Sequence, residues 1–269
     1  MLILKDALVA LRLIFRAGFS QLAVGLVVVV LLATLLSSYF SGRQLATVGV
    51  DVGFSTMRLL LPLLLVLLMQ EVLFREFDKR YYLSSLAHPR TRINLLAGRV
   101  VAVLVFVLGL LLVLSVLLVC LVEMIGGMYL QSTPVGLGLP YIVTISFFAV
   151  DLLVLTSVAT LLSVLASTPS FVLIGTLGFM LVARSYGAVV ELLSSDSGLV
   201  GNAENYRDSL GVLGYLVPDL GALDVRMIML YGKMEFLPSD WGWLLLSCLS
   251  YIIALLALSV CALQRKRFN

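Results

Sequence analysis

Catalytic chemistry has few candidates in this chain of 269 residues, because the side chains that most often carry it are scarce. His88 is the only histidine, and it lies in a polar stretch rather than in an apolar one. A Ser–His pair inside an apolar segment, which an intramembrane serine protease needs, is therefore excluded. The three cysteines, Cys120, Cys248 and Cys261, lie in apolar runs without CxxC spacing. This pattern is typical of small buried residues rather than of a zinc site or a disulfide framework.

Nucleotide binding by the chain itself is not indicated either. The sequence has no GxxxxGK[ST] motif, so it lacks the loop that cradles ATP phosphates, and it has no HExxH metal motif. The net charge of +3 is small and scattered, which does not favour nucleic acid as a partner. We therefore predict no catalytic residue, no bound cofactor and no metal site in this chain, and expect a transport or scaffolding role.

Two ionisable residues lie deep in apolar segments, Asp151 and Arg184. The short joint at 167–170 predicts that their segments form an antiparallel hairpin. Asp151 precedes Thr168 by 17 residues and Arg184 follows it by 16, so both lie at roughly 25 Å from the turn at about 1.5 Å rise per residue. Opposite charges at equal depth predict an ion pair, because neither is stable alone in hydrocarbon. We favour a pair that locks the two helices together over one that lines a polar substrate path, and both roles stay open.

The rest of the sequence predicts membrane-spanning helices. Its composition is 61% hydrophobic and 12% charged, whereas soluble domains have roughly a quarter charged residues. We expect an all-α polytopic membrane protein with a single transmembrane domain over residues 1–269 and six spans. Arg43 and Asp51 are expected in the first loop, and Pro62 near the start of the second span, where its missing N–H costs little. The predicted spans are about 22–40, 58–74, 94–122, 141–166, 171–193 and 243–263.

Two segments outside the spans have patterns of their own. Residues 1–17 predict an amphipathic elbow helix on the membrane surface, with Lys5, Arg12 and Arg16 on one face. The same charges argue against a cleavable signal peptide. Residues 194–241 are polar at first and then show a broken apolar pattern, so we expect short helices that cap one membrane face. The face of the elbow helix opposite to its cations is predicted to hold Leu4, Leu8, Leu11 and Phe15.

The distribution of positive charge predicts the orientation. With the N-terminus inside, 12 of the 18 Lys and Arg residues lie on the inner side, in 1–17, in 75–99 and at the C-terminus, and five lie on the outer side. Short loops rich in Lys and Arg are cytoplasmic. We therefore expect both termini and residues 75–93 on the cytoplasmic side, and 194–241 on the outer side.

The polar stretch 75–99 is the most informative segment of the first half. It combines apolar side chains at Tyr81, Tyr82, Leu83 and Leu86 with a rim of positive charges. Such a combination fits a short helix that anchors in a groove of a partner protein. An ordinary positive loop, with its tyrosines at headgroup level, is the alternative. The rim consists of Lys79, Arg80, Arg90 and Arg92.

The order of these parts resembles the type-2 family of ABC exporter membrane subunits. That family has an amphipathic elbow, six spans, a coupling helix between spans two and three, and outside helices before span six. Its coupling loop tends to have an acidic residue, a basic turn, small and apolar residues, Pro-x-x-Arg, and Gly-Lys or Gly-Arg in the next span. The runs here are Glu76-Phe77-Asp78-Lys79-Arg80, Leu83-Ser84-Ser85-Leu86-Ala87, Pro89-Arg90-Thr91-Arg92 and Gly98-Arg99. The later runs Tyr215-Leu216-Val217-Pro218, Leu223-Asp224 and Arg265-Lys266-Arg267-Phe268 are similar to the family's outside segment and ending.

The resemblance implies a permease in a bacterial inner membrane that works as a dimer with a second copy or a homologous permease. Two separate ABC ATPase subunits would bind ATP and Mg and dock on residues 76–92. The apolar first and second spans hint at an amphiphilic or lipid-linked cargo, and an accessory protein outside stays open. The alternative is a non-transporting membrane scaffold that acts through 194–241. The residues expected to dock the ATPase are Glu76, Asp78, Lys79, Arg80, Tyr81, Tyr82, Leu83, Leu86, Pro89, Arg90 and Arg92.

Overall fold

The computed structural model describes residues 2–42, 44–74, 92–127, 135–195 and 218–265, and every regular element in these ranges is helical. Six of the helices are long and apolar enough to cross a membrane, namely α2, α3 with η1, α6, α7, α8 and α11. The chain is therefore an all-α polytopic membrane protein. The elements are α1 (Leu2–Arg16), α2 (Phe19–Phe40), α3 (Leu45–Met69) with the π-helical turn η1 (Gln70–Phe74), α6 (Arg92–Gly126), α7 (Leu139–Leu165), α8 (Pro169–Ser195), α10 (Arg226–Tyr231), the 3-10 turn η2 (Met234–Phe236) and α11 (Trp241–Arg265).

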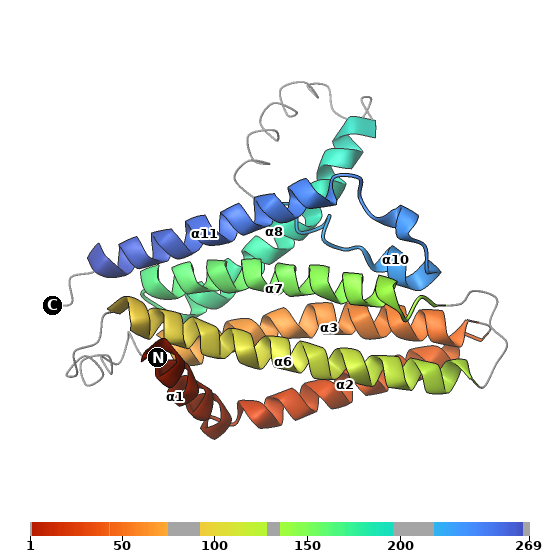
Figure 1. The fold of residues 1–269 in the computed structure, drawn as a ribbon, viewed down its shortest axis with the longest axis horizontal. Helices are drawn as coiled ribbons and strands as arrows, with labels where there is room; N and C mark the ends of the chain where they lie inside the picture. The colour runs from red at the N-terminus through yellow and green to blue at the C-terminus, as the bar shows by residue number, and fades with distance from the viewer. Residues whose placement is uncertain (1, 43, 75–91, 128–134, 196–217, 266–269) are drawn as a thin grey trace.

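The bundle is built around α3 and α7 (Figure 1). Helix α3 contacts α2, α6, α7 and α8, whereas α11 packs mainly along α7. Helix α1 and the last turn of α11 lie at one end of the bundle, and α10 lies at the other (Figure 1). We call these the α1 end and the α10 end.

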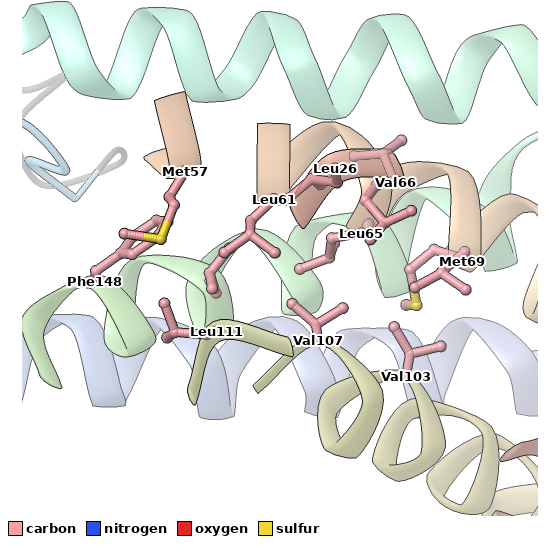
Figure 2. Packing of buried hydrophobic residues seen from close by; sticks show 14 of the residues in the cluster. Leu26, Met57, Leu61, Leu65, Val66, Met69, Val103, Val107, Leu111 and Phe148 are labelled. Atoms are coloured by element: carbon pink, nitrogen blue, oxygen red, sulfur yellow. The ribbon is translucent and has the colours of Figure 1, made fainter. Parts of the chain in front are cut away.

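The core lies where α3 meets α6 and α7 (Figure 2). Met57, Leu61 and Leu65 follow one another at four-residue spacing along α3, so they share one face of the helix, and none is exposed. Lipid tails are as apolar as these side chains, so close packing rather than transfer from water holds such helices together. The facing residues in Figure 2 are Val103, Val107 and Leu111 of α6 and Phe148 of α7.

Helices α2 and α3 approach each other closely through small residues. Gly49 and Gly53 form a Gly-x-x-x-Gly pair on the face of α3 that meets α2. A Cβ atom at Gly53 would lie 2.5 Å from Thr34 Oγ1 and 2.6 Å from a methyl carbon of Leu118. A side chain at position 53 would therefore require Thr34 or Leu118, which are both buried, to shift.

The segment predicted to form the elbow is helical as α1, and Lys5, Arg12 and Arg16 are all exposed. Gly18 follows it with φ of 84°, the left-handed conformation that lets the chain turn into α2.

The apolar face of α1 differs from the predicted one. Opposite to the cations lies a buried stripe of Ala7, Ala10 and Ile14, which packs against the bundle. Leu4, Leu8 and Phe15 are exposed beside the cations. Small residues face protein because α1 crosses α6 at Gly98, where an added Cβ atom would lie 2.7 Å from that of Asp6.

The second span begins earlier than predicted. Helix α3 starts at Leu45, so Asp51 and Arg58 belong to the helix and not to a loop or a span end. Pro62 lies in the interior of α3 and is buried. The apolar run just before Asp51 continues the span, and the charges inside it are tolerated because they pair with other elements.

The remaining spans agree with the predicted ones within a few residues, apart from a longer α6. The hairpin is tighter than predicted, since α8 begins at Pro169. In the described part of 194–241, the expected short helices are α10 and η2.

Candidate functional site

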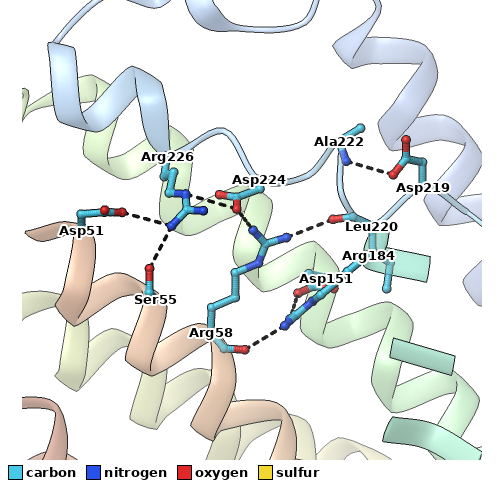
Figure 3. A network of polar contacts seen from close by, with 10 residues as sticks. All are labelled: Asp51, Ser55, Arg58, Asp151, Arg184, Asp219, Leu220, Ala222, Asp224 and Arg226. Atoms are coloured by element: carbon cyan, nitrogen blue, oxygen red, sulfur yellow. Dashed lines mark hydrogen bonds and ion pairs between the residues drawn. The ribbon is translucent and has the colours of Figure 1, made fainter. Parts of the chain in front are cut away.

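The predicted ion pair is present and belongs to a larger polar network near the α10 end (Figure 3). Arg184 Nη2 lies 2.5 Å from Asp151 Oδ2, which joins α8 to α7. The Asp151 side chain is 1% exposed and that of Arg184 is 18% exposed. A buried carboxylate of this kind requires a cation beside it, because hydrocarbon does not solvate the charge.

Arg184 also forms a hydrogen bond to α3. Its Nη1 donates a hydrogen bond of 3.0 Å to the backbone oxygen of Arg58 in α3. In a regular helix this oxygen would accept the N–H four residues later, at position 62. That position is Pro62, which has no N–H, so the proline leaves the oxygen available. The planar guanidinium therefore ties α3, α7 and α8 together through two separate nitrogens.

The side chain of Arg58 points from α3 toward the segment that precedes α10 (Figure 3). Its Nη2 donates to the Leu220 backbone oxygen at 3.1 Å, and its Nη1 pairs with Asp224 Oδ2. The Arg58 and Asp224 side chains are 13% and 20% exposed, respectively. Arg58 thus holds this segment onto the end of the bundle.

A third arginine, Arg226, stands at the start of α10. Its Nη1 donates to Asp51 Oδ1 at 3.1 Å and to Ser55 Oγ at 2.9 Å, while its Nε lies 3.4 Å from Asp224 Oδ2. Asp51, Ser55 and Arg58 follow one another at spacings of four and three residues, which places them on one face of α3. Asp224 forms ion pairs with both Arg58 and Arg226 and so bridges the two.

Two glycines let the segment 218–225 lie against α8. A Cβ atom at Gly187 would lie 2.6 Å from Asp219 Oδ2, and one at Gly221 would lie 2.7 Å from the Arg184 oxygen. The Leu220 N–H donates to the Ala183 oxygen at 3.1 Å. Asp219 Oδ1 accepts from the Ala222 N–H at 3.1 Å, which closes a tight turn.

These side chains surround a cavity of about 700 Å³. Arg58, Arg184 and Arg226 all line it, and each of the three has an acidic partner. Guanidinium groups stay protonated at physiological pH, so the three arginines act here as fixed positive charges, and Asp219 and Asp224 line the cavity beside them. No group of three His, Cys, Asp or Glu side chains that could hold a metal ion occurs in the described ranges. What this arrangement can do is fix α3, α7, α8 and the segment before α10 to one another.

Most of the predicted ATPase-docking residues lie outside the described part of the chain. Arg92 opens α6, but its side chain is not described either. Those fully outside are Glu76, Asp78, Lys79, Arg80, Tyr81, Tyr82, Leu83, Leu86, Pro89 and Arg90.

The sequence reasoning missed Asp51, Ser55, Arg58, Asp224 and Arg226 as one network. The signal in the sequence was the polar face of α3, which becomes visible once the apolar run before Asp51 is included in the span. The acidic and basic pair at 224 and 226 then matches the opposite charges on that face.

No protein-family model matches this sequence, and no curated protein matches it. The function therefore has to be inferred from the residues and their arrangement.

Proposed function

We propose that this chain is the membrane subunit of an ATP-driven ABC exporter and that it works as a dimer with separate ATPase subunits. The observation that carries the proposal is that the predicted docking segment connects two helices of the core. Residues 75–91 connect the end of η1 at Phe74 to the start of α6 at Arg92, and α3 and α6 pack along each other in the core. A partner bound to this segment would act directly on two central helices.

The continuous helix from Leu45 to Phe74 supports a mechanical role. Its 30 residues span about 45 Å at 1.5 Å per residue. One end leads into the predicted docking segment, and the other carries Asp51, Arg58 and the polar network. Movement of this helix at the α1 end would therefore be transmitted to α7, α8 and the segment before α10.

In this proposal the α1 end is cytoplasmic and the membrane is a bacterial inner membrane, as the distribution of Lys and Arg favours. Helix α1 is the lateral elbow, with Lys5, Arg12 and Arg16 toward anionic headgroups. ATP and Mg are bound by the partner subunits, so this chain performs no hydrolysis of its own. Substrate passes between two copies, chiefly along α2, α3 and α8, and the apolar character of α2 and α3 favours an amphiphilic or lipid-linked cargo. An extracytoplasmic accessory protein would meet the α10 end.

A non-transporting scaffold is the second candidate. It is favoured by the way in which Arg58, Asp224 and Arg226 fix the segment 218–226 onto the bundle, which would make a firm platform for a partner outside. For a scaffold of this kind, the rate of ATP hydrolysis by a bound ATPase subunit is not expected to change when cargo is added.

The test is ATP hydrolysis in lipid by this chain together with a candidate ATPase subunit. Tyr82→Ala/Leu86→Glu removes two predicted anchors, and Tyr231→Ala/Phe236→Glu makes a similar change at the α10 end, where both side chains are 47% exposed. We expect the first variant to lose stimulated hydrolysis at least tenfold and the second to keep it. Equal hydrolysis in both variants would refute docking at 76–92.

A further inference from the structure

A second cavity lies between α2 and α6 near the α10 end, with a volume of about 370 Å³. Its walls are mostly apolar, with Leu31 and Leu35 from α2 facing Leu117 and Leu121 from α6. Ser38 of α2 also lines it. We call this cavity the α2–α6 groove.

The dimensions of the groove restrict what can occupy it. It extends along α2 from Leu31 to Tyr39, which is about 12 Å of helix. A volume of 370 Å³ over that length leaves a cross-section of roughly 30 Å², which admits one extended hydrocarbon chain but not an α-helix of about 10 Å diameter. Because α2 and α6 both span the membrane, hydrocarbon is also what surrounds the groove.

Ser38 closes the groove on the side of α3. Its side chain is 1% exposed, and its Oγ has no hydrogen-bond partner within the described ranges. The Oγ atom exposes less than 1 Å² and lies toward Gly49 of α3, so an occupant of the groove meets the rest of this residue and not its hydroxyl. On the α3 side the hydroxyl is closed off by Gly49, where an added Cβ atom would clash with it.

The depth of Ser38 indicates which part of a lipid would meet it. The next two residues, Tyr39 and Phe40, are 80% and 87% exposed at the end of α2. Exposed aromatic side chains at helix ends mark the headgroup level of a membrane. Ser38 therefore lies at the level of the ester groups that join acyl chains to the lipid headgroup.

We propose that the α2–α6 groove binds one acyl chain of a phospholipid from the leaflet at the α10 end. The ester group lies at the level of Ser38 and Tyr39, and the chain runs between the leucines toward the middle of the membrane. The groove uses neither the docking segment nor the polar network, although α2 is also one of the helices along which the proposed cargo would pass.

The first test measures phospholipid that stays bound to the purified protein after extensive washing in detergent. Leu121→Trp fills the groove, and Leu112→Trp makes the same change on the 63% exposed face of the same helix. We expect about one phospholipid on the wild type and on Leu112→Trp, and none on Leu121→Trp. Equal retention by both tryptophan variants would overturn the proposal.

The second test requires no bulky substitution. Cys120 is exposed and lines the groove, whereas Cys261 is exposed on α11. We expect added phospholipid to slow alkylation of Cys120 in a Cys261→Ser background, and to leave Cys261 unaffected in a Cys120→Ser background. Unchanged alkylation of Cys120, or efficient crosslinking of two chains through it in lipid, would show that no acyl chain fills the groove.

Discussion

Arg184 donates a hydrogen bond to the one backbone oxygen of α3 that Pro62 deprives of its helical partner. Pro62 on α3 leaves this oxygen without a donor from its own helix, and Arg184 on α8 supplies a donor in its place. Without Arg184, the Arg58 oxygen would be a buried acceptor in a membrane-spanning helix, which costs free energy. Without Pro62, the oxygen would already be bonded within α3.

This relationship predicts energetic coupling between positions 62 and 184. Pro62→Ala supplies an N–H to the Arg58 oxygen, so it should stabilise Arg184→Ala more than it stabilises the wild type. We expect a coupling free energy of about 1 kcal/mol in a double-mutant cycle of unfolding in detergent.

The control cycle combines Pro62→Ala with Gln70→Ala. Gln70 lies two turns further along the helix and bonds to the Pro169 oxygen at 2.5 Å. These two changes should be additive, and an additive result for positions 62 and 184 would contradict the shared oxygen.

The Asp151–Arg184 pair predicts unequal costs for its two partners. Arg184→Ala leaves a buried carboxylate and should cost about 3 kcal/mol or more, seen as a large loss of folded yield. Asp151→Asn keeps a neutral acceptor and should cost less. The exchange Asp151→Arg/Arg184→Asp should recover only part of the yield, because an aspartate at position 184 donates nothing to the Arg58 oxygen. Complete recovery by the exchange would mean that the hydrogen bond from position 184 to the Arg58 oxygen does not contribute to folding.

The close approach of α2 and α3 predicts that Gly53 tolerates no side chain. Gly53→Ala would place a Cβ atom against Thr34 and Leu118, and should destabilise the protein by about 1–3 kcal/mol. Gly25→Ala and Gly109→Ala are matched controls, since no atom lies within 4 Å of a Cβ there. Thermal unfolding in detergent should separate the first variant from the other two, and equal midpoints for all three would refute the close packing.

Asp224 is predicted to hold the segment before α10 in place, because it pairs with Arg58 and Arg226 at once. Asp224→Asn should speed hydrogen exchange in 218–231 at least tenfold while α7 stays protected. Asp240→Asn provides a control at an acidic residue near the start of α11. Unaltered exchange in Asp224→Asn would mean that the backbone contacts of Leu220, and not Asp224, hold this segment against the bundle.

The sequence predicted the Asp151–Arg184 pair because a short hairpin relates depth directly to residue number. It did not predict the Arg226–Asp51 contact, whose partners are 175 residues apart. No local pattern places α10 against α3, since that arrangement depends on how separate helices pack.

Pro62 shows a second limit of sequence reasoning. A proline predicts a span boundary when only its own helix is considered. In the structure a side chain from another helix satisfies the oxygen that it leaves available, so the span runs on from Leu45. The apolar face of α1 was misassigned for a similar reason, because small residues that pack on α6 are less conspicuous than leucines.

Docking of an ATPase subunit on residues 76–92 is the central claim, and site-directed photocrosslinking tests it most directly. Ser85→Cys in a Cys120→Ser/Cys261→Ser background would carry a photoreactive maleimide in membranes that contain the candidate ATPase. Ser239→Cys in the same background is the control at the α10 end. The exporter account predicts a crosslink to the ATPase from position 85 that changes with ATP, and none from position 239. An ATPase subunit that never crosslinks to position 85 while this chain is folded in the membrane would contradict it.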